Sequence, residues 1–365
     1  MRKIDAAVVG AGAVGCIAAK ELACRGLETV VFEEHPRPGK FGKCTGLVST
    51  RGLEALHVNY KHAVVSRVSG AAIHSPHFSF EVRRKNVAAV LDRQRFDEEC
   101  AAEAVDAGAA IRYGSRVIGF SRKKEENGTR VVTGNDGKKR FAARFIIGAD
   151  GAQSPTAAAR GFPPLEKLVL CCEKEFPRAR VCDEEKVEVF VDNKLYPGFF
   201  AWIVPAGGGA RIGFGTTRFD LAPGIEKKFF AKKEVRDAVG ARKPKKSYWA
   251  VIPLAAREKT QAGNVLLVGD AAGQVKATTG GGIVFGGLCA RVAAECVAES
   301  VVNKEPPRYE ERWRDELGAV LRVHSFTRRC ADAAPNPLLD FFTAAANFGP
   351  AKFLDWFGDM DFILR

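Results

Sequence analysis

The sequence predicts an α/β protein in which a parallel sheet with helices is interrupted by an inserted antiparallel β-sheet and followed by a C-terminal helical region. Three observations predict this fold. Residues 4–34 contain a continuous apolar strand, a glycine turn, a helix with apolar residues at helical spacing and a second strand. Short alternating segments between 165 and 255 are typical of an antiparallel sheet. The segment "GNVLLVGDAAG" at 263–273 then returns to a buried strand that ends in a turn.

The remaining segments complete this plan. Residues 89–114 predict a long helix followed by a short strand, and residues 129–150 predict a hairpin with its turn at 134–137 and then a buried strand. The first domain is therefore expected to be discontinuous, with the pieces 1–60, 90–160 and 258–304. An antiparallel substrate domain is expected from 61–89 and 161–257, and the C-terminal helical region from 305–365.

The N-terminal unit carries a dinucleotide-binding pattern. Gly10, Gly12 and Gly15 have the spacing G-x-G-x-x-G directly after the first strand. The first glycine permits a tight turn, the second lets a pyrophosphate approach the backbone, and the third lets helix and strand pack closely. Glu33 ends the second strand, where its carboxylate can accept a hydrogen bond from a ribose hydroxyl. Strand, glycines, helix and acid together predict a Rossmann-type domain.

Two later strands each end in an aspartate, and they favour FAD over NAD as the cofactor. "FIIGAD" ends in Asp150 and "NVLLVGD" ends in Asp270. The Asp270 carboxylate is placed to bind the ribityl or pyrophosphate region of a flavin. The glycine-rich run that follows, from Gly280 to Gly282, offers backbone N–H groups near an isoalloxazine ring.

Composition limits the partners and the compartment. The chain has 365 residues and a net charge of +13, which favours anionic partners. The basic residues are scattered and not interleaved with aromatic residues, so we expect no nucleic-acid partner. None of the ten cysteines forms a C-x-x-C pair, so we expect no metal site. The chain enters a strand without a signal-peptide pattern and contains no apolar run of spanning length, so a cytoplasmic location is expected.

The C-terminal segment "NPLLDFFTAAANFGPAKFLDWFGDMDFILR" is rich in Phe and Trp. As a helix it would have one apolar side, which includes Leu338, Phe341 and Phe342 and, further on, Phe348 and Trp356. Such a side suits peripheral contact with a membrane surface. Its charges are mainly Asp, which an anionic bilayer repels, so we expect this side to pack against the body of the protein.

Four segments in this order, "GAGAVG", "LDRQRFD", "GADGAQS" and "GDAAGQ", resemble the flavoprotein group that includes the aromatic hydroxylases. Within that group the chain is most similar to the geranylgeranyl reductases of archaeal membrane-lipid synthesis. The narrower resemblance rests on "KCTGLVS", "YPGFFAWIVP" and "GDAAGQVKATTGGGIVFGG".

The resemblance implies noncovalently bound FAD and reduction of isolated C=C bonds in isoprenoid chains. It implies an isoprenoid lipid substrate. The electron donor stays open between NAD(P)H, a ferredoxin-like protein and another carrier. The residues expected to bind FAD lie in the glycine turn, the acidic strand ends, the cysteine segment and the second glycine run: Gly10, Gly12, Ala13, Val14, Gly15, Glu33, Cys44, Thr45, Gly46, Arg93, Asp150, Asp270, Gly280, Gly281, Gly282 and Ile283.

The segment "YPGFFAWIVP" resembles the substrate motif of the family, which has the form Tyr-x-Trp-x-Phe-Pro. Phe200, Trp202, Val204 and Pro205 stand at these positions, so a hydroxyl and a ring are missing. The resemblance implies that Phe200, Trp202 and Pro205 contact substrate. The pattern "DGxxSxxR" of the hydroxylases is also broken, because Ala157 stands where the arginine should be.

Cys44 is the expected catalytic residue. It lies in a loop-like segment of glycines and small polar residues, where a structural cysteine is unusual. Saturation of an alkene requires a hydride and a proton, and a thiol with a pKa of about 8.5 is a suitable proton donor at neutral pH. A cysteine of the resembling family sits in this loop near the flavin, which implies a proton donor or gate here.

Two other functions remain open at this point. One is an FAD-dependent monooxygenase or dehydrogenase that acts on a small aromatic compound or a quinone. The other is a flavin protein that only carries electrons or scaffolds a membrane assembly. Cys44 and the Trp202 segment favour the reductase, whereas an intact "DGxxSxxR" would have favoured the monooxygenase. The large inserted domain argues against a simple electron carrier.

Overall fold

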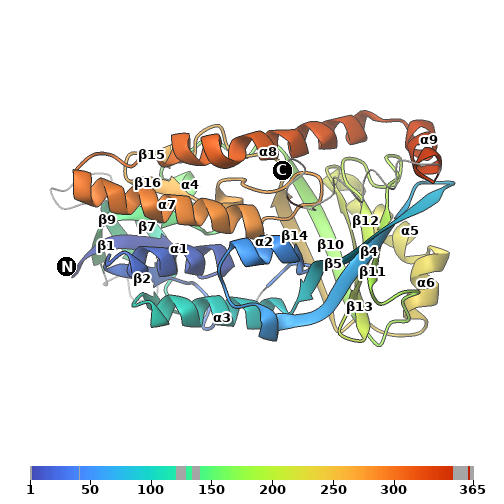
Figure 1. Ribbon diagram of the computed structural model, residues 1–365, viewed down its shortest axis with the longest axis horizontal. Coiled ribbons are helices and arrows are strands. Elements are labelled where there is room, and N and C mark those ends of the chain that lie inside the picture. Colours follow the sequence, from blue (N-terminus) through green and yellow to red (C-terminus); the bar gives the residue numbers. More distant parts are fainter. Residues whose placement is uncertain (1, 41, 121–128, 134–139, 348–360, 362–365) are drawn as a thin grey trace.

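A computed structural model describes residues 2–40, 42–120, 129–133, 140–347 and 361. It confirms the predicted α/β fold with an antiparallel sheet and C-terminal helices. Figure 1 shows the first sheet and its helices in one half of the molecule and the second sheet in the other half. The predicted hairpin turn at 134–137 lies outside the described residues.

The first sheet is mainly parallel and has the order β15-β16-β9-β1-β2-β6, with β7 and β8 added beside β9. Its strands are β1 (Arg2–Val9), β2 (Thr29–Phe32), β6 (Ala110–Arg112), β7 (Val117–Phe120), β8 (Thr129–Thr133), β9 (Arg140–Gly148), β15 (Gln261–Ala262) and β16 (Val265–Leu267). The pairs β1–β2, β1–β9, β2–β6 and β9–β16 are parallel. Continuous apolar runs form the central strands because both faces are covered.

Helices cover one face of this sheet, and α4 and β7 pack on the other. The covering helices are α1 (Ala13–Cys24), α3 (Arg93–Asp106), α7 (Ile283–Asn303) and α8 (Tyr309–Ala333), while α4 spans Pro155–Ala159. The helix predicted within 89–114 begins at Arg93 as α3 because Asp92 caps it, accepting hydrogen bonds from the N–H groups of Gln94 and Arg95.

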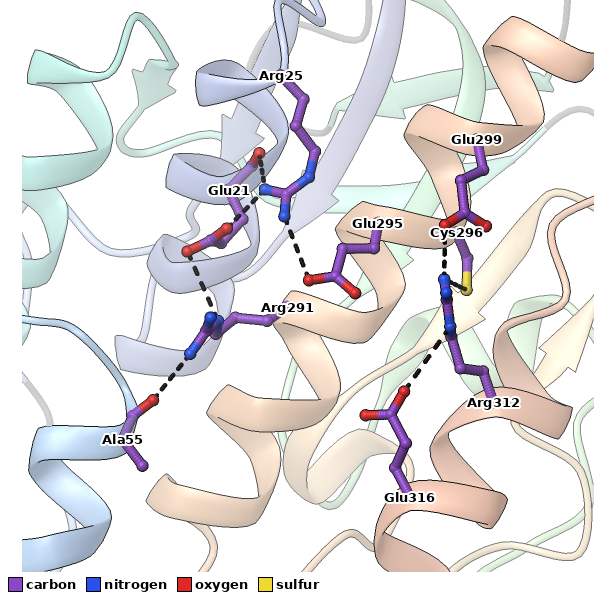
Figure 2. A network of polar contacts seen from close by, with 9 residues as sticks. All are labelled: Glu21, Arg25, Ala55, Arg291, Glu295, Cys296, Glu299, Arg312 and Glu316. Atoms are coloured by element: carbon purple, nitrogen blue, oxygen red, sulfur yellow. Dashed lines mark hydrogen bonds and ion pairs between the residues drawn. The ribbon is translucent and has the colours of Figure 1, made fainter.

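Polar contacts also connect these helices at their surface (Figure 2). Arg25, the residue after α1, contacts Glu21 of α1 at 2.6 Å and Glu295 of α7 at 3.3 Å. Arg312 of α8 contacts Glu299 of α7 at 2.8 Å. Because such exposed pairs contribute little to stability, the apolar core beneath them holds the helices together.

The second sheet has the order β14-β10-β13-β12-β11-β4-β5-β3 and is antiparallel except for the parallel pair β4–β11. Its strands are β3 (Leu47–Ser49), β4 (Val64–His74), β5 (Ser79–Leu91), β10 (Leu168–Pro177), β11 (Lys186–Phe190), β12 (Ala201–Ala206), β13 (Gly209–Thr216) and β14 (Lys246–Pro253). Short helical segments are α2 (Thr50–Ala55), α5 (Ala222–Phe230), α6 (Lys233–Val239), η1 (Lys61–Ala63), η2 (Phe219–Leu221) and η3 (Gly269–Ala271).

The two faces of the second sheet have different neighbours. One face packs beneath α5 and α6 in a cluster that includes Phe190, Ile203 and Phe229. The opposite face forms a cluster that includes Trp202, Phe199 and Ala277, and Ala277 belongs to the segment after β16. The second face is therefore turned toward the first half of the molecule. The domain ranges proposed from the sequence stay a prediction, and β3 joins the second sheet although it lies within 1–60.

The C-terminal region continues with α9 (Asn336–Ala346), which lies beyond α8 at the far end of the molecule (Figure 1). The expectation that Phe341 and Phe342 pack on the body is wrong, because they are 65% and 60% exposed. The buried side of α9 is polar instead. Asp340 accepts hydrogen bonds from the Ser75 hydroxyl at 2.6 Å and from the His77 backbone N–H at 3.0 Å. Phe348 and Trp356 lie outside the described residues.

Among the described residues, no helix has the length and apolar character needed to cross a membrane.

Candidate active site

The glycine turn after β1 has the geometry of a dinucleotide site. Gly10 has a φ of +99°, and a Cβ there would lie 2.5 Å from the Ala149 carbonyl oxygen. A Cβ on Gly15 would lie 2.0 Å from the Gly10 carbonyl oxygen, so α1 packs directly on the turn. A Cβ on Gly12 would meet no described atom within 4 Å. The turn is thus closed on the protein side at Gly10 and Gly15 and open at Gly12.

The start of α1 adds free donors to this open side. Ala13 and Val14 begin the helix, and Gly12 precedes them without a side-chain cap. The first N–H groups of a helix have no partner within the helix, and the helix dipole favours a negative group near them. A pyrophosphate fits this position.

Glu33 follows β2 at the same edge of the sheet. Its carboxylate accepts hydrogen bonds from the Ala11 N–H at 2.7 Å and the His35 N–H at 2.9 Å. These bonds fix the carboxylate beside the glycine turn. An ionised carboxylate has about four acceptor positions, so Glu33 keeps capacity for a ribose hydroxyl.

Asp150 lies beside the turn but uses its carboxylate locally. It accepts hydrogen bonds from the Ser154 hydroxyl at 2.6 Å and the Thr156 N–H at 2.7 Å. These bonds stabilise the start of α4. The structure therefore gives Asp150 a clear role in its own turn.

Asp270 lies against the second glycine run. A Cβ on Gly282 would lie 2.5 Å from Asp270 Oδ1, which explains a glycine there. Burial raises the pKa of Asp270, and the nearby Arg93 charge opposes this rise. Gly281 forms an isolated β-bridge with Lys276, and Ile283 begins α7. A Cβ on Gly280 would lie 3.2 Å from the Phe199 ring, so this run reaches the second sheet.

Arg93 begins α3 and connects the two halves of the site. Its Nη2 donates to Asp97 Oδ1 at 2.9 Å. Burial opposes its charge, but the nearby Asp97 and Cys44 outweigh this effect and raise the pKa of Arg93. Its Nε is buried and has no hydrogen-bond partner within the described part of the chain. A buried donor in this state fits a bound ligand acceptor.

Cys44 is half-buried, and its sulfur accepts a hydrogen bond from the Gly46 N–H at 3.3 Å. Gly46 has a φ of +72°, and a Cβ there would lie 2.5 Å from the Leu91 carbonyl oxygen. Arg211 Nη1 donates to the Thr45 carbonyl at 2.5 Å and to the Leu91 carbonyl at 2.8 Å. The segment Cys44–Gly46, called the cysteine loop below, is therefore held at the junction of the two halves.

The aromatic candidates lie on the side of the second sheet that faces this junction. The rings of Phe199 and Phe200 stack with centroids 4.2 Å apart, and Phe200 and Trp202 lie 5.8 Å apart. Pro205 does not join them. Because side chains alternate along a strand, Pro205 lies on the same face of β12 as Ile203, which packs toward α5 and α6.

Sequence reasoning missed three side chains at the junction, which are Glu173, Tyr248 and Arg211. Glu173 is 2% exposed, and its carboxylate accepts hydrogen bonds from Trp202 Nε1 at 2.8 Å, from Thr45 Oγ1 and from the Tyr248 hydroxyl. One signal was present, because Val169, Cys171 and Glu173 alternate along β10 and place a carboxylate on an apolar face.

These residues fit FAD. The open Gly12, the uncapped start of α1, Glu33 and the unpaired Arg93 Nε form a continuous set of polar partners for a dinucleotide. Asp270 and the second glycine run extend this set toward Cys44 and the aromatic side chains, where an isoalloxazine would meet a substrate.

Comparison with known proteins agrees with this fit. A family described as an FAD binding domain matches residues 3–286. Digeranylgeranylglycerophospholipid reductase 2 of Methanopyrus kandleri is 30% identical over 340 residues, covering 88% of this chain and 84% of that protein. Digeranylgeranylglycerophospholipid reductase of Methanosarcina acetivorans is 30% identical over 356 residues, covering 89% and 84%.

A solved structure supports the fold. The geranylgeranyl bacteriochlorophyll reductase-like protein of Thermoplasma acidophilum aligns with a TM-score of 0.85 and 20% identity, covering 100% of this chain and 98% of that chain. The matched domain confirms FAD as the cofactor, and together with the reductase relatives it confirms an oxidoreductase as the class of enzyme. The chain therefore belongs to the FAD-dependent geranylgeranyl reductase family.

Proposed function

We propose that this enzyme saturates C=C bonds of geranylgeranyl chains in archaeal-type membrane lipid precursors. The observation that carries this proposal is the position of Cys44, which lies in a loop whose Thr45 hydroxyl binds the same Glu173 carboxylate as the Trp202 indole. The names of relatives that are 30% identical support the substrate class. A monooxygenase or dehydrogenase acting on a small aromatic compound or a quinone is the alternative.

Bound and reduced FAD supplies the hydride for such a reaction. In our proposal, the glycine turn and the start of α1 bind the pyrophosphate, Glu33 binds a ribose, and Arg93, Asp270 and residues 280–282 hold the flavin end. Phe200 and Trp202 give the prenyl chain an apolar surface and exclude water. Cys44 donates the proton to the second alkene carbon, and the thiolate then regains a proton from solvent.

The reductant is either NAD(P)H or a ferredoxin-like protein, as proposed from the sequence. The first would be shown by flavin bleaching on anaerobic addition of NADPH or NADH. If neither nucleotide bleaches the flavin, NAD(P)H is excluded as the direct donor.

Two glycine variants test the cofactor site. Gly12→Ala places a methyl group in open space at a φ of −71°, so the fold should be unchanged. The same methyl group should obstruct the pyrophosphate and weaken FAD binding by at least about tenfold. Gly15→Ala is the contrast, because its Cβ meets the Gly10 carbonyl and should cost about 1–3 kcal/mol of stability. FAD titration and thermal unfolding measure both effects. Equal FAD affinity of Gly12→Ala and wild type would contradict the assignment.

A second test concerns Cys44. Photoreduced holoenzyme is mixed without oxygen with a digeranylgeranyl glycerophospholipid, and the mass of the lipid product is measured by mass spectrometry. Wild type should add one H₂ per saturated bond, and Cys44→Ala should do so about 100-fold more slowly, the typical contribution of a general acid. Cys24→Ala is the matched control, since Cys24 is an exposed thiol of α1. Equal rates for Cys44→Ala and wild type would remove the thiol from the proton path. No mass gain in wild type would reject the lipid substrate.

Peripheral membrane contact through α9 is part of the proposal. Phe341 and Phe342 are exposed, and Phe78 of the neighbouring β4–β5 turn is 50% exposed. Wild type should sediment with vesicles of archaeal-type phospholipid, and the double variant Phe341→Ser/Phe342→Ser should sediment less. Phe326→Ser, at an equally exposed position of α8, is the control. The same sedimentation of all three proteins would exclude α9 as the contact.

A further inference from the structure

One row of residues crosses four strands of the second sheet beneath the cysteine loop. Trp202 of β12 lies opposite Gly213 of β13, Gly213 opposite Glu173 of β10, and Glu173 opposite Tyr248 of β14. Directly opposed residues of antiparallel strands point to the same face. Trp202, Glu173 and Tyr248 thus lie side by side on the face that is turned toward Cys44.

Gly213 leaves space for the Trp202 indole to reach Glu173 across β13. A Cβ at Gly213 would lie 2.6 Å from Trp202 Cζ2, so any side chain there would displace the indole. With glycine, the indole lies across β13 and its Nε1 donates to Glu173 Oε2 at 2.8 Å. The indole nitrogen can only donate, so Glu173 fixes the direction in which the ring points.

The second donor to Glu173 comes from the cysteine loop. Thr45 Oγ1 donates to the same Oε2 atom that accepts from Trp202, and the Tyr248 hydroxyl donates to Oε1. Burial and the adjacent Glu173 charge raise the pKa of Tyr248, so this phenol remains a donor. A buried carboxylate is stable only where donors surround it. All three donors depend on one carboxylate that is 2% exposed.

We propose that Glu173 is a positioning residue, which holds the cysteine loop through Thr45 and the Trp202 indole through Nε1 at a fixed spacing. This inference rests on the proposed function, in which the thiol and the indole meet the same prenyl chain. Glu173 itself acts through these two neighbours. The single carboxylate thereby couples the proton donor to the surface that receives the substrate.

The test uses holoenzyme and three variants. Glu173→Gln keeps the size of the side chain but replaces one acceptor oxygen with a donor. Thr45→Val removes only the loop's hydroxyl. Glu175→Gln is the matched control, because Glu175 lies two residues along the same strand and its side chain is 28% exposed, with Lys246 Nζ at 3.9 Å.

The first readout does not depend on the lipid. Anaerobic holoenzyme is treated with iodoacetamide, and alkylation of Cys44 is followed by peptide mass spectrometry, with the exposed Cys24, Cys182 and Cys330 as internal references. Glu173→Gln and Thr45→Val should each change the Cys44 rate at least about threefold while the reference rates and Glu175→Gln stay as in wild type. The second readout is lipid turnover, where kcat should fall about tenfold in Glu173→Gln.

In the double variant Glu173→Gln/Thr45→Val, the Cys44 alkylation rate should differ from wild type by no more than in the more strongly affected single variant. Both changes break the same hydrogen bond, so their effects should not add. The inference fails if Cys44 alkylation and kcat in Glu173→Gln match wild type, whatever its thermal stability. If Glu173→Gln does not fold, Thr45→Val alone decides on the same readouts. If wild type leaves the lipid unchanged but the Cys44 alkylation rate still changes in Glu173→Gln, the positioning role of Glu173 is supported and the proposed substrate is rejected.

Discussion

The position of the cysteine loop is constrained because its backbone contacts both Leu91 and Arg211. Gly46 adopts a left-handed conformation against the Leu91 carbonyl, and Arg211 donates to the carbonyls of both Thr45 and Leu91. Leu91 ends β5 of the second sheet, and α3 begins two residues later at Arg93. The loop therefore fixes the distance between the start of α3, which belongs to the nucleotide half, and the aromatic face of the second sheet.

Charged side chains complete this junction. Arg93 donates to Asp97 on the nucleotide side, and Glu173 accepts from three donors on the other side. Buried charges persist only with partners, so each charge demands a specific arrangement of its neighbours. Arg93 Nε has no acceptor among the described residues, and in our proposal the flavin cofactor provides one. In this proposal, cofactor binding and thiol position are parts of one network.

The sequence predicted those features of the fold and the site that depend on residues close together in the chain. The glycine spacing and the apolar strands predicted the nucleotide half, and Cys44 stood out because its surroundings are not apolar. Glu173 was missed because its three partners lie far away in the sequence and only the alternation along β10 reveals its face. Pro205 was expected beside Trp202, but the two residues are three apart on one strand. Alternation of side chains therefore places them on different faces of the sheet. Phe341 and Phe342 were expected to pack on the body of the protein, but the buried side of α9 is polar.

The most direct test of the central claim is a single-turnover measurement of the flavin. Reduced holoenzyme is mixed without oxygen with a digeranylgeranyl glycerophospholipid, and separately with the same lipid already saturated, while the absorbance of oxidised flavin is recorded. The account predicts that absorbance returns with the unsaturated lipid and stays absent with the saturated one, since only the former accepts the electrons. Flavin that stays reduced with both lipids but is reoxidised by oxygen and a small aromatic substrate would contradict it.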